Sequence, residues 1–257
     1  MSSPQVLVHP DAGQLARAVA ARISGRMAEA VAATGSASLV LTGGGIGTSV
    51  LAELAAGPAR DEIDWARLDI WWGDERFGPA GDPERNETGA RAALLDHVNV
   101  DPDRVHAMPP SDGPDGDHPE AAAERYAAVL RAASGSEHGA VPSFDLLLLG
   151  IGPEGHVASL FPEMPAVHET KRMVVAVRDA PKPPPTRLSL TFPAIQAARE
   201  VWILASGAEK ASAVRLALSG AEPALVPAAG ARGRERTLFL VDQAAAAELP
   251  AELTRNS

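Results

Sequence analysis

The stretch FDLLLLGIGPEGHVASLFP, residues 144–162, is an apolar run that ends in a glycine turn. The run is continuous rather than alternating, which is typical of a central strand that is covered on both faces of a parallel sheet. The turn contains G-x-G-x-x-G from Gly150 to Gly155, and within it Glu154 stands two residues before His156. The stretch is therefore compatible with two kinds of site, a dinucleotide-binding turn and an acid–base pair.

The dinucleotide interpretation meets three physical objections. Pro162 limits any helix after His156 to about two turns, whereas the diphosphate needs a longer helix whose N-terminus faces it. Glu154 would place a carboxylate against the diphosphate, and Pro153 lacks the N–H that should donate to it. Asp179, near the end of a later strand, is where a ribose-binding acid would stand, but the acid–base interpretation is favoured. In it, a carboxylate orients the imidazole and stabilises its protonated form.

Outward from this stretch, strand patterns alternate with helix patterns along the whole chain. Asp11 and Gln14 form a capping box, after which Leu15, Val19 and Ile23 mark one face of a long helix. Strands are expected at 5–8, 37–45, 68–76, 104–109, 144–152, 172–177, 186–192, 199–207 and 236–242, with a polar turn closing 68–76. Further helices are expected at 48–56, 86–98, 118–134, 208–220 and 243–249. This order predicts an α/β fold with a mostly parallel sheet in a single domain, residues 1–257.

The composition limits the partners of the chain. Its formal net charge is −10 and it has no basic block, which argues against nucleic acid or an anionic membrane as the main partner. It has no cysteine, so disulfides and thiolate chemistry are excluded. No apolar run approaches the ~18 residues of a membrane span, and the first residues do not read as a signal peptide, so a cytoplasmic location is expected. The only lysines are Lys171, Lys182 and Lys210.

Polar candidates for a site follow several expected strands, at 43–48, 73–76, 150–156 and 206–210. Ligands of open α/β sheets bind beyond the carboxyl ends of the strands, so these segments are expected to meet. The first is a glycine turn whose backbone N–H groups would suit an anion, although no lysine follows it as in a P-loop. Arg76 is suited to fork onto a phosphate or carboxylate, but a charged turn satisfied by its own ion pairs is an alternative.

Two further cations stand in unusual surroundings. The proline-stiffened segment PKPPPTR ends in Arg187 and would deliver its guanidinium into a cleft with little loss of entropy. Lys210 lies in the first turn of an expected helix, where the dipole disfavours a cation, and this is weak support for a bound anion. The chain has neither the metal-ligand spacing of H-E-x-x-H nor a G-x-S-x-G nucleophile elbow. A site here would work with water, a base and cations.

Four ordered motifs resemble those of the 6-phosphogluconolactonase family. They are LLLLGIGPEGHVASLFP, WWGDERF with the asparagine-containing segment after it, PPPTRLSLT and SGAEKASAV. The resemblance spans almost the whole chain. It implies a three-layer α/β/α sandwich with a modified Rossmann topology, shared with glucosamine-6-phosphate deaminase, ribose-5-phosphate isomerase and CoA-transferase. It also implies hydrolysis of 6-phospho-D-glucono-1,5-lactone to 6-phospho-D-gluconate by a carboxylic ester hydrolase without cofactor or metal, as a monomer or weak dimer.

The resemblance also implies roles for individual residues. His156 would be the general base and Glu154 its acidic neighbour. The residues implied for substrate and phosphate binding are Gly43, Gly44, Gly45, Asp74, Arg76, Asn86, Arg187 and Lys210. The chain departs from the family at its phosphate turn, which usually reads S-G-G-S-T-P but here is T-G-G-G-I-G. Thr48 or Ser49 is the candidate replacement for the missing hydroxyls.

Two alternative functions are kept open. A deaminase of glucosamine 6-phosphate would use a histidine in the same place to open the sugar ring, but its relatives usually show an aspartate–glutamate–tyrosine turn where this chain has GDER. A sugar-phosphate-binding regulator without turnover would usually carry a DNA-binding domain, and would have no use for a base beside an acid in the binding turn.

Overall fold

Six parallel strands form the central sheet, in the order β1-β9-β8-β5-β2-β3. The structure is a computed structural model, and it describes residues 3–135 and 140–254. The strands are β1 (Gln5–His9), β2 (Ala37–Leu41), β3 (Leu68–Trp72), β5 (Leu146–Gly150), β8 (Glu200–Ala205) and β9 (Arg236–Asp242). The apolar run that opens the sequence analysis is β5, and it lies between β8 and β2 as expected of a strand buried on both faces.

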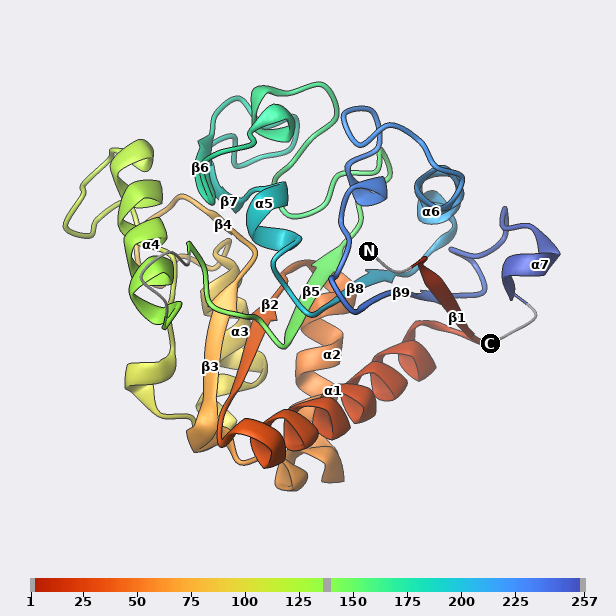
Figure 1. Ribbon diagram of the computed structural model, residues 1–257, viewed down its shortest axis with the longest axis horizontal. Helices are drawn as coiled ribbons and strands as arrows, with labels where there is room; N and C mark the ends of the chain where they lie inside the picture. The colour runs from red at the N-terminus through yellow and green to blue at the C-terminus, as the bar shows by residue number, and fades with distance from the viewer. Residues whose placement is uncertain (1–2, 136–139, 255–257) are drawn as a thin grey trace.

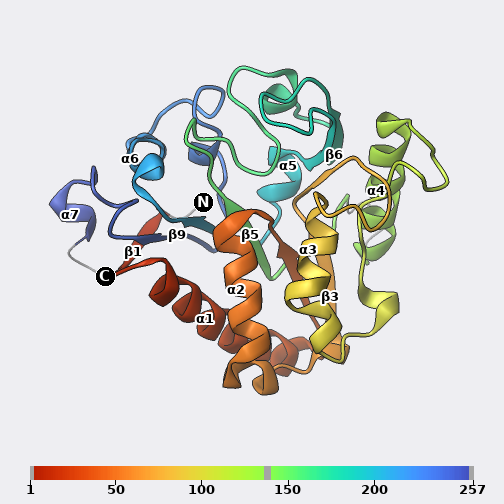
Figure 2. The ribbon, with the colours of Figure 1, turned by 180° about the vertical axis from the view of Figure 1, so that it is seen from behind.

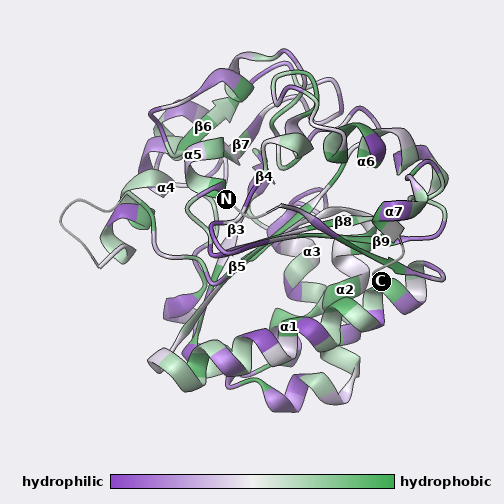
Figure 3. Cartoon of the chain, turned by 45° about the vertical axis from the view of Figure 1, so that its right-hand side comes forward, coloured by the Kyte–Doolittle hydropathy of each residue, from purple (hydrophilic) through white to green (hydrophobic). Residues whose placement is uncertain are grey.

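Helices cover both faces of this sheet and make it the middle of three layers. Figure 2 shows α1, α2 and α3 side by side on one face. Figure 3 shows α4, α5, α6 and a small second sheet on the other. The helices are α1 (Ala12–Thr34), α2 (Gly44–Ala56), α3 (Asn86–Ala93), α4 (Pro119–Ala133), α5 (Phe192–Ile195), α6 (Ala211–Leu218) and α7 (Ala251–Thr254). The predicted α/β/α sandwich with a mostly parallel sheet is confirmed.

The first helix forms for the reasons that its sequence suggests. The Asp11 carboxylate accepts from the backbone N–H of Gln14 at 2.8 Å and from its side-chain amide at 2.9 Å, which closes the N-terminal cap. Leu15, Val19 and Ile23 are fully buried against the sheet. The helix ends at Gly35, whose φ of 86° favours glycine.

The second sheet corrects one prediction. Residues 74–76 were expected to be a turn, but β4 (Asp74–Arg76) pairs antiparallel with β7 (Arg187–Leu190), which pairs antiparallel with β6 (Val174–Val177). The three strands stand above the carboxyl edge of the main sheet (Figure 1). They carry Asp74, Arg76 and Arg187 together to that edge, although 76 and 187 are far apart in the sequence.

Two predicted elements are wrong. The strand at 104–109 is reduced to a single bridge between Val105 and Ile70, because prolines at 109 and 110 have no N–H to continue a ladder. The segment 243–249, which was expected to be a helix, is a series of turns. The Asp242 carboxylate accepts a hydrogen bond from the N–H of Ala245, and Pro250 ends the segment. The largest shifts of helix bounds are that α2 begins at Gly44, α3 ends at Ala93 and α6 begins at Ala211. Lys210 is therefore the N-cap residue of α6, at the end of a 3₁₀ turn, and not a residue of its first turn.

Candidate active site

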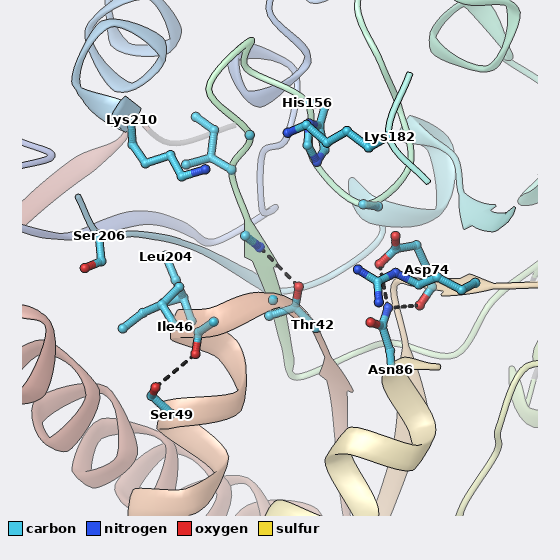
Figure 4. Close-up of a pocket in the computed structure, with 18 of the residues that line it drawn as sticks. Thr42, Ile46, Ser49, Asp74, Asn86, His156, Lys182, Leu204, Ser206 and Lys210 are labelled. Carbon is cyan, nitrogen blue, oxygen red and sulfur yellow. Dashed lines mark hydrogen bonds between the residues drawn. The ribbon is translucent and has the colours of Figure 1, made fainter. Parts of the chain in front are cut away.

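A cavity of about 590 Å³ lies at the carboxyl edge of the main sheet. The turns after β2, β5 and β8 meet there with the small second sheet, and Figure 4 shows His156, Lys182 and Lys210 reaching in from above Thr42 and Asn86. The predicted site residues that line it are Gly43, Gly44, Gly45, Asp74, Arg76, Asn86, His156, Arg187 and Lys210. Glu154 does not line the cavity, but its carboxylate contacts Nδ1 of the His156 ring.

The glycine turn after β5 packs against the His156 imidazole and lacks the features of a nucleotide-binding turn. A Cβ on Gly152 would overlap the His156 ring, and the Gly152 N–H donates to the His156 carbonyl at 2.9 Å. Gly155 has a φ of 88°, which favours glycine. After β5 the next helical segment is a short 3₁₀ turn at Pro165–His168, so the helix required by a dinucleotide fingerprint is missing from this described part of the chain. The dinucleotide interpretation is excluded on this geometry.

His156 is held by a carboxylate on one side and an aromatic ring on another. Its Nδ1 lies 2.7 Å from Glu154 Oε1, and its ring centroid lies 4.6 Å from that of Phe161. The side chain is 17% exposed, so one edge still reaches the cavity. With the carboxylate accepting from Nδ1–H, Nε2 of the neutral ring carries the lone pair that can take a proton.

Burial and the neighbouring charge act on His156 in opposite directions. Burial lowers the pKa of His156 below its ordinary value, and this outweighs the raising effect of the Glu154 carboxylate. For Glu154, burial raises the pKa, but its backbone N–H, His156 and Lys182 together bring it below its ordinary value. At neutral pH the pair is therefore a carboxylate beside a neutral imidazole, the state that a general base requires.

Lys182 is a cavity residue that the sequence analysis did not assign. It lies 28 residues after Glu154, and its Nζ is 3.2 Å from Glu154 Oε2. It faces Lys210, whose pKa is lowered by burial and then by the charge of Lys182. The only signal in the sequence was its rarity, as one of three lysines. Two ammonium groups that repel each other in one cavity make a positive pocket in an acidic protein, suited to an anionic ligand.

Arg187 is placed at the cavity, but most of its donors are already used. Its Nε donates to the carbonyl of Pro184 at 3.1 Å, and its Nη2 donates to those of Lys182 at 3.0 Å and Pro183 at 3.3 Å. The guanidinium carbon lies 5.6 Å from the centroid of the Phe161 ring. Arg187 therefore shapes the turn that carries Lys182 into the cavity.

Asp74 and Asn86 form a buried hydrogen-bonded unit. The Asn86 amide donates to the Asp74 carbonyl at 2.9 Å and to its carboxylate at 3.3 Å (Figure 4). The Ser159 hydroxyl donates to the other carboxylate oxygen at 2.7 Å. A Cβ on Gly43 would overlap the Asn86 amide. The unit thus connects the glycine turn to the loop that carries His156.

The glycine turn is the start of α2. Gly43 is the N-cap residue and makes no side-chain capping bond, and the turn lines the cavity, so the first backbone N–H groups of a 13-residue helix lie beside it. Of the two hydroxyls proposed as replacements, only Ser49 lines this cavity, and it donates to the Gly45 carbonyl at 2.9 Å. Thr48 lines a neighbouring cavity instead.

Two classes of feature are missing from residues 3–135 and 140–254. They contain no group of three or more His, Cys, Asp or Glu side chains that could hold a metal ion. They also contain no helix of the length and apolarity that crossing a membrane requires.

Comparisons with known proteins agree on one family. A sequence model of glucosamine-6-phosphate isomerases/6-phosphogluconolactonase matches residues 10–240. The 6-phosphogluconolactonase of Streptomyces coelicolor is 62% identical over 252 residues, covering 98% of this chain and 97% of that protein. That of Mycobacterium tuberculosis is 52% identical over 248 residues, covering 96% and 99%. The solved structure of 6-phosphogluconolactonase from Trypanosoma brucei superposes with a TM-score of 0.83 at 30% identity, covering 97% of this chain and 100% of the other.

Proposed function

The chain belongs to the family of glucosamine-6-phosphate isomerases and 6-phosphogluconolactonases, and we propose that His156 is the general base of its reaction. The reaction is hydrolysis of 6-phospho-D-glucono-1,5-lactone to 6-phospho-D-gluconate, a step of the pentose phosphate pathway, which makes the chain a carboxylic ester hydrolase. The observation that carries the role of His156 is its neutral, mostly buried imidazole, which Glu154 holds at 2.7 Å at the wall of a cationic cavity.

In the proposed mechanism, the Nε2 lone pair of His156 takes a proton from a water molecule while the oxygen of that water attacks C1 of the lactone. The C1 carbonyl becomes a tetrahedral oxyanion, for which the Arg76 guanidinium at the cavity wall is the proposed donor. The bond from C1 to the ring oxygen then breaks, and the protonated His156 returns its proton to that oxygen. Glu154 stabilises the imidazolium between the two proton transfers. The new carboxylic acid ionises in solution and releases one proton for each turnover.

The phosphate at the far end of the substrate aligns the lactone. We assign it to Lys210 and Lys182, with the N–H groups of the glycine turn Gly43–Gly45 as further donors. Lys182 is preferred to Arg187 in this role, because Nε and Nη2 of Arg187 already donate to carbonyls of its own turn. Asn86 and Arg76 are proposed to border the sugar. A single domain over 1–257, a cytoplasmic location and a monomeric or weakly dimeric state remain predictions.

The function is tested by proton release in weak buffer with 6-phosphogluconolactone, with the spontaneous rate subtracted. The expected result is saturable turnover, with no ammonia released from glucosamine 6-phosphate by the same preparation. Ammonia release without lactone hydrolysis would assign the deaminase reaction instead. Binding of 6-phosphogluconate without either turnover would assign a regulatory binding protein.

A further inference from the structure

Glu75 is a fully buried carboxylate that contributes nothing to the cavity wall, although both its neighbours in β4 do. Its Oε1 accepts the backbone N–H of Arg76 at 2.8 Å and that of Asn86 at 2.6 Å, and its Oε2 accepts that of Glu87 at 2.9 Å. Asn86 and Glu87 open helix α3, whose own N-cap residue, Arg85, makes no side-chain capping bond. Glu75 thus caps α3 from a different element of the fold.

Burying the Glu75 carboxylate in the interior costs desolvation free energy. Arg85 is also completely buried. Its Nη2 lies 3.7 Å from Glu75 Oε2 and 3.1 Å from Glu87 Oε2, and it donates to the Met108 carbonyl at 2.8 Å. Burial raises the pKa of Glu75 to about 7, although Arg85 and the three backbone N–H groups lower it. A buried ion pair contributes little to stability compared with an apolar pair, so its place at this point of the fold needs another reason.

The groups that Glu75 holds lead directly to the cavity. Arg76 and Asn86 line it, and they also line a second cavity of about 510 Å³, so with the glycine turn Gly43–Gly45, Thr42 and Ser49 they separate the two. Asn86 bonds Asp74, and Asp74 accepts from Ser159, which is three residues after His156. A shift of α3 relative to β4 would therefore move the cavity wall and the loop of the base together.

We propose that Glu75 is a positioning residue of the lactonase reaction, which fixes Arg76 and Asn86 in the cavity wall by accepting their backbone N–H groups. It touches no substrate and acts through those two residues. The inference rests on the proposed function for its kinetic readout only.

The test compares Glu75→Gln and Glu75→Ala with a matched control, Glu200→Gln. Glu200 is a buried carboxylate that accepts from Arg26 at 3.0 Å and from the Trp202 indole at 2.9 Å, at the amino end of β8, opposite the cavity. We would measure the Tm of each variant. We would then measure its kcat and KM at a temperature well below that Tm. We expect kcat/KM to fall about ten-fold in Glu75→Gln, where one side-chain oxygen still accepts, and about a hundred-fold in Glu75→Ala. Glu200→Gln should keep both constants within about two-fold for a comparable loss of Tm.

Two results would overturn the inference. One is a folded Glu75→Gln variant whose kcat and KM stay within about two-fold of the unsubstituted chain. The other is a Glu200→Gln variant that loses as much activity at the same loss of Tm. If Glu75→Gln does not fold, the double variant Glu75→Gln/Arg85→Met removes the charges of both fully buried side chains, while Glu87 keeps its ion pair with Arg91 at 2.9 Å. Full activity in the double variant would also overturn the inference.

A binding measurement separates this inference from the proposed function. Titration calorimetry with 6-phosphogluconate requires no turnover, so it reports on the cavity wall even if the lactonase reaction is absent. We expect its affinity to fall about ten-fold in Glu75→Gln and to be unchanged in Glu200→Gln. Equal affinities in both variants would overturn the positioning role.

Discussion

Replacing Glu154 by glutamine removes the charge behind the proposed base while keeping its shape. The hydrogen bond to His156 Nδ1 is 2.7 Å long, and a hydrogen bond to an ionised group contributes about 1.5–3 kcal/mol. Glu154 is 34% exposed and shares its charge with Lys182, so solvent screening places the value at the low end, about 1.5 kcal/mol. Because this stabilisation belongs to the imidazolium that forms in the reaction, its loss should lower kcat about ten-fold.

The same substitution changes the pH dependence in a defined direction. The base works when His156 is neutral, so kcat/KM of the unsubstituted chain should fall as pH drops through the pKa of His156, which lies below its ordinary value. The Glu154 carboxylate raises that pKa against the stronger lowering by burial. Without it the pKa falls further, and the acid limb of kcat/KM should move to lower pH.

Initial rates of proton release across the acid limb measure both effects, with spontaneous hydrolysis subtracted at each pH. Glu209→Gln is the control, because Glu209 is an exposed carboxylate of the same cavity and its charge acts on Lys210 rather than His156. This variant should leave the acid limb where it is. A Glu154→Gln limb that does not move, or that moves to higher pH, would refute the reasoning that the carboxylate stabilises the imidazolium.

Three further changes give separate outcomes. His156→Asn should lower kcat by about 10²–10⁴-fold with little change in Tm, and turnover near that of the unsubstituted chain would remove the residue from the mechanism. Gly43→Ala should lower both Tm and kcat/KM, because a Cβ there overlaps the Asn86 amide; Gly45→Ala, where a Cβ meets open space, is the matched control, and equal losses of Tm would contradict the steric argument. Lys210→Met should raise KM about ten-fold with a smaller change in kcat, if its contact is made equally in ground and transition states; an unchanged KM would contradict a phosphate role.

Local patterns in the sequence were enough to predict an α/β fold with a mostly parallel sheet and the edge of that sheet at which the cavity lies, whereas the three-layer arrangement was implied by the family resemblance. The continuous apolar run of β5 and the capping box of Asp11 depend on residues a few positions apart, so they can be recognised without the fold. The same is true of the Glu154–His156 pair, whose contact spans two residues. The rule that ligands bind beyond the carboxyl ends of parallel strands then brought the separate polar turns together.

What the sequence analysis missed depends on contacts between distant residues. Lys182 contacts Glu154 across 28 positions, and the contact between Glu75 and Arg85 depends on how β4 lies against the N-terminus of α3. Residues 74–76 read as a turn because a three-residue strand has no period of its own, and its partner, β7, lies more than a hundred residues later. Arg187 was placed correctly at the cavity, but its bonds to the carbonyls of its own turn were not foreseeable from spacing.

The arrangement around His156 resolves a conflict inherent in one-base catalysis. An imidazole must be neutral to accept a proton from water, yet its cation must not be so unstable that the transfer becomes too unfavourable. Burial alone would keep it neutral but would destabilise the cation, whereas a carboxylate alone would raise its pKa and reduce the neutral fraction at pH 7. In this chain burial and the Glu154 carboxylate both act on the pKa of His156, and burial has the larger effect. Lys182, which is paired with Glu154, lowers that pKa as well. Lys182, the cation proposed to bind the substrate phosphate, thereby also lowers the pKa of His156 and helps to keep the proposed base neutral.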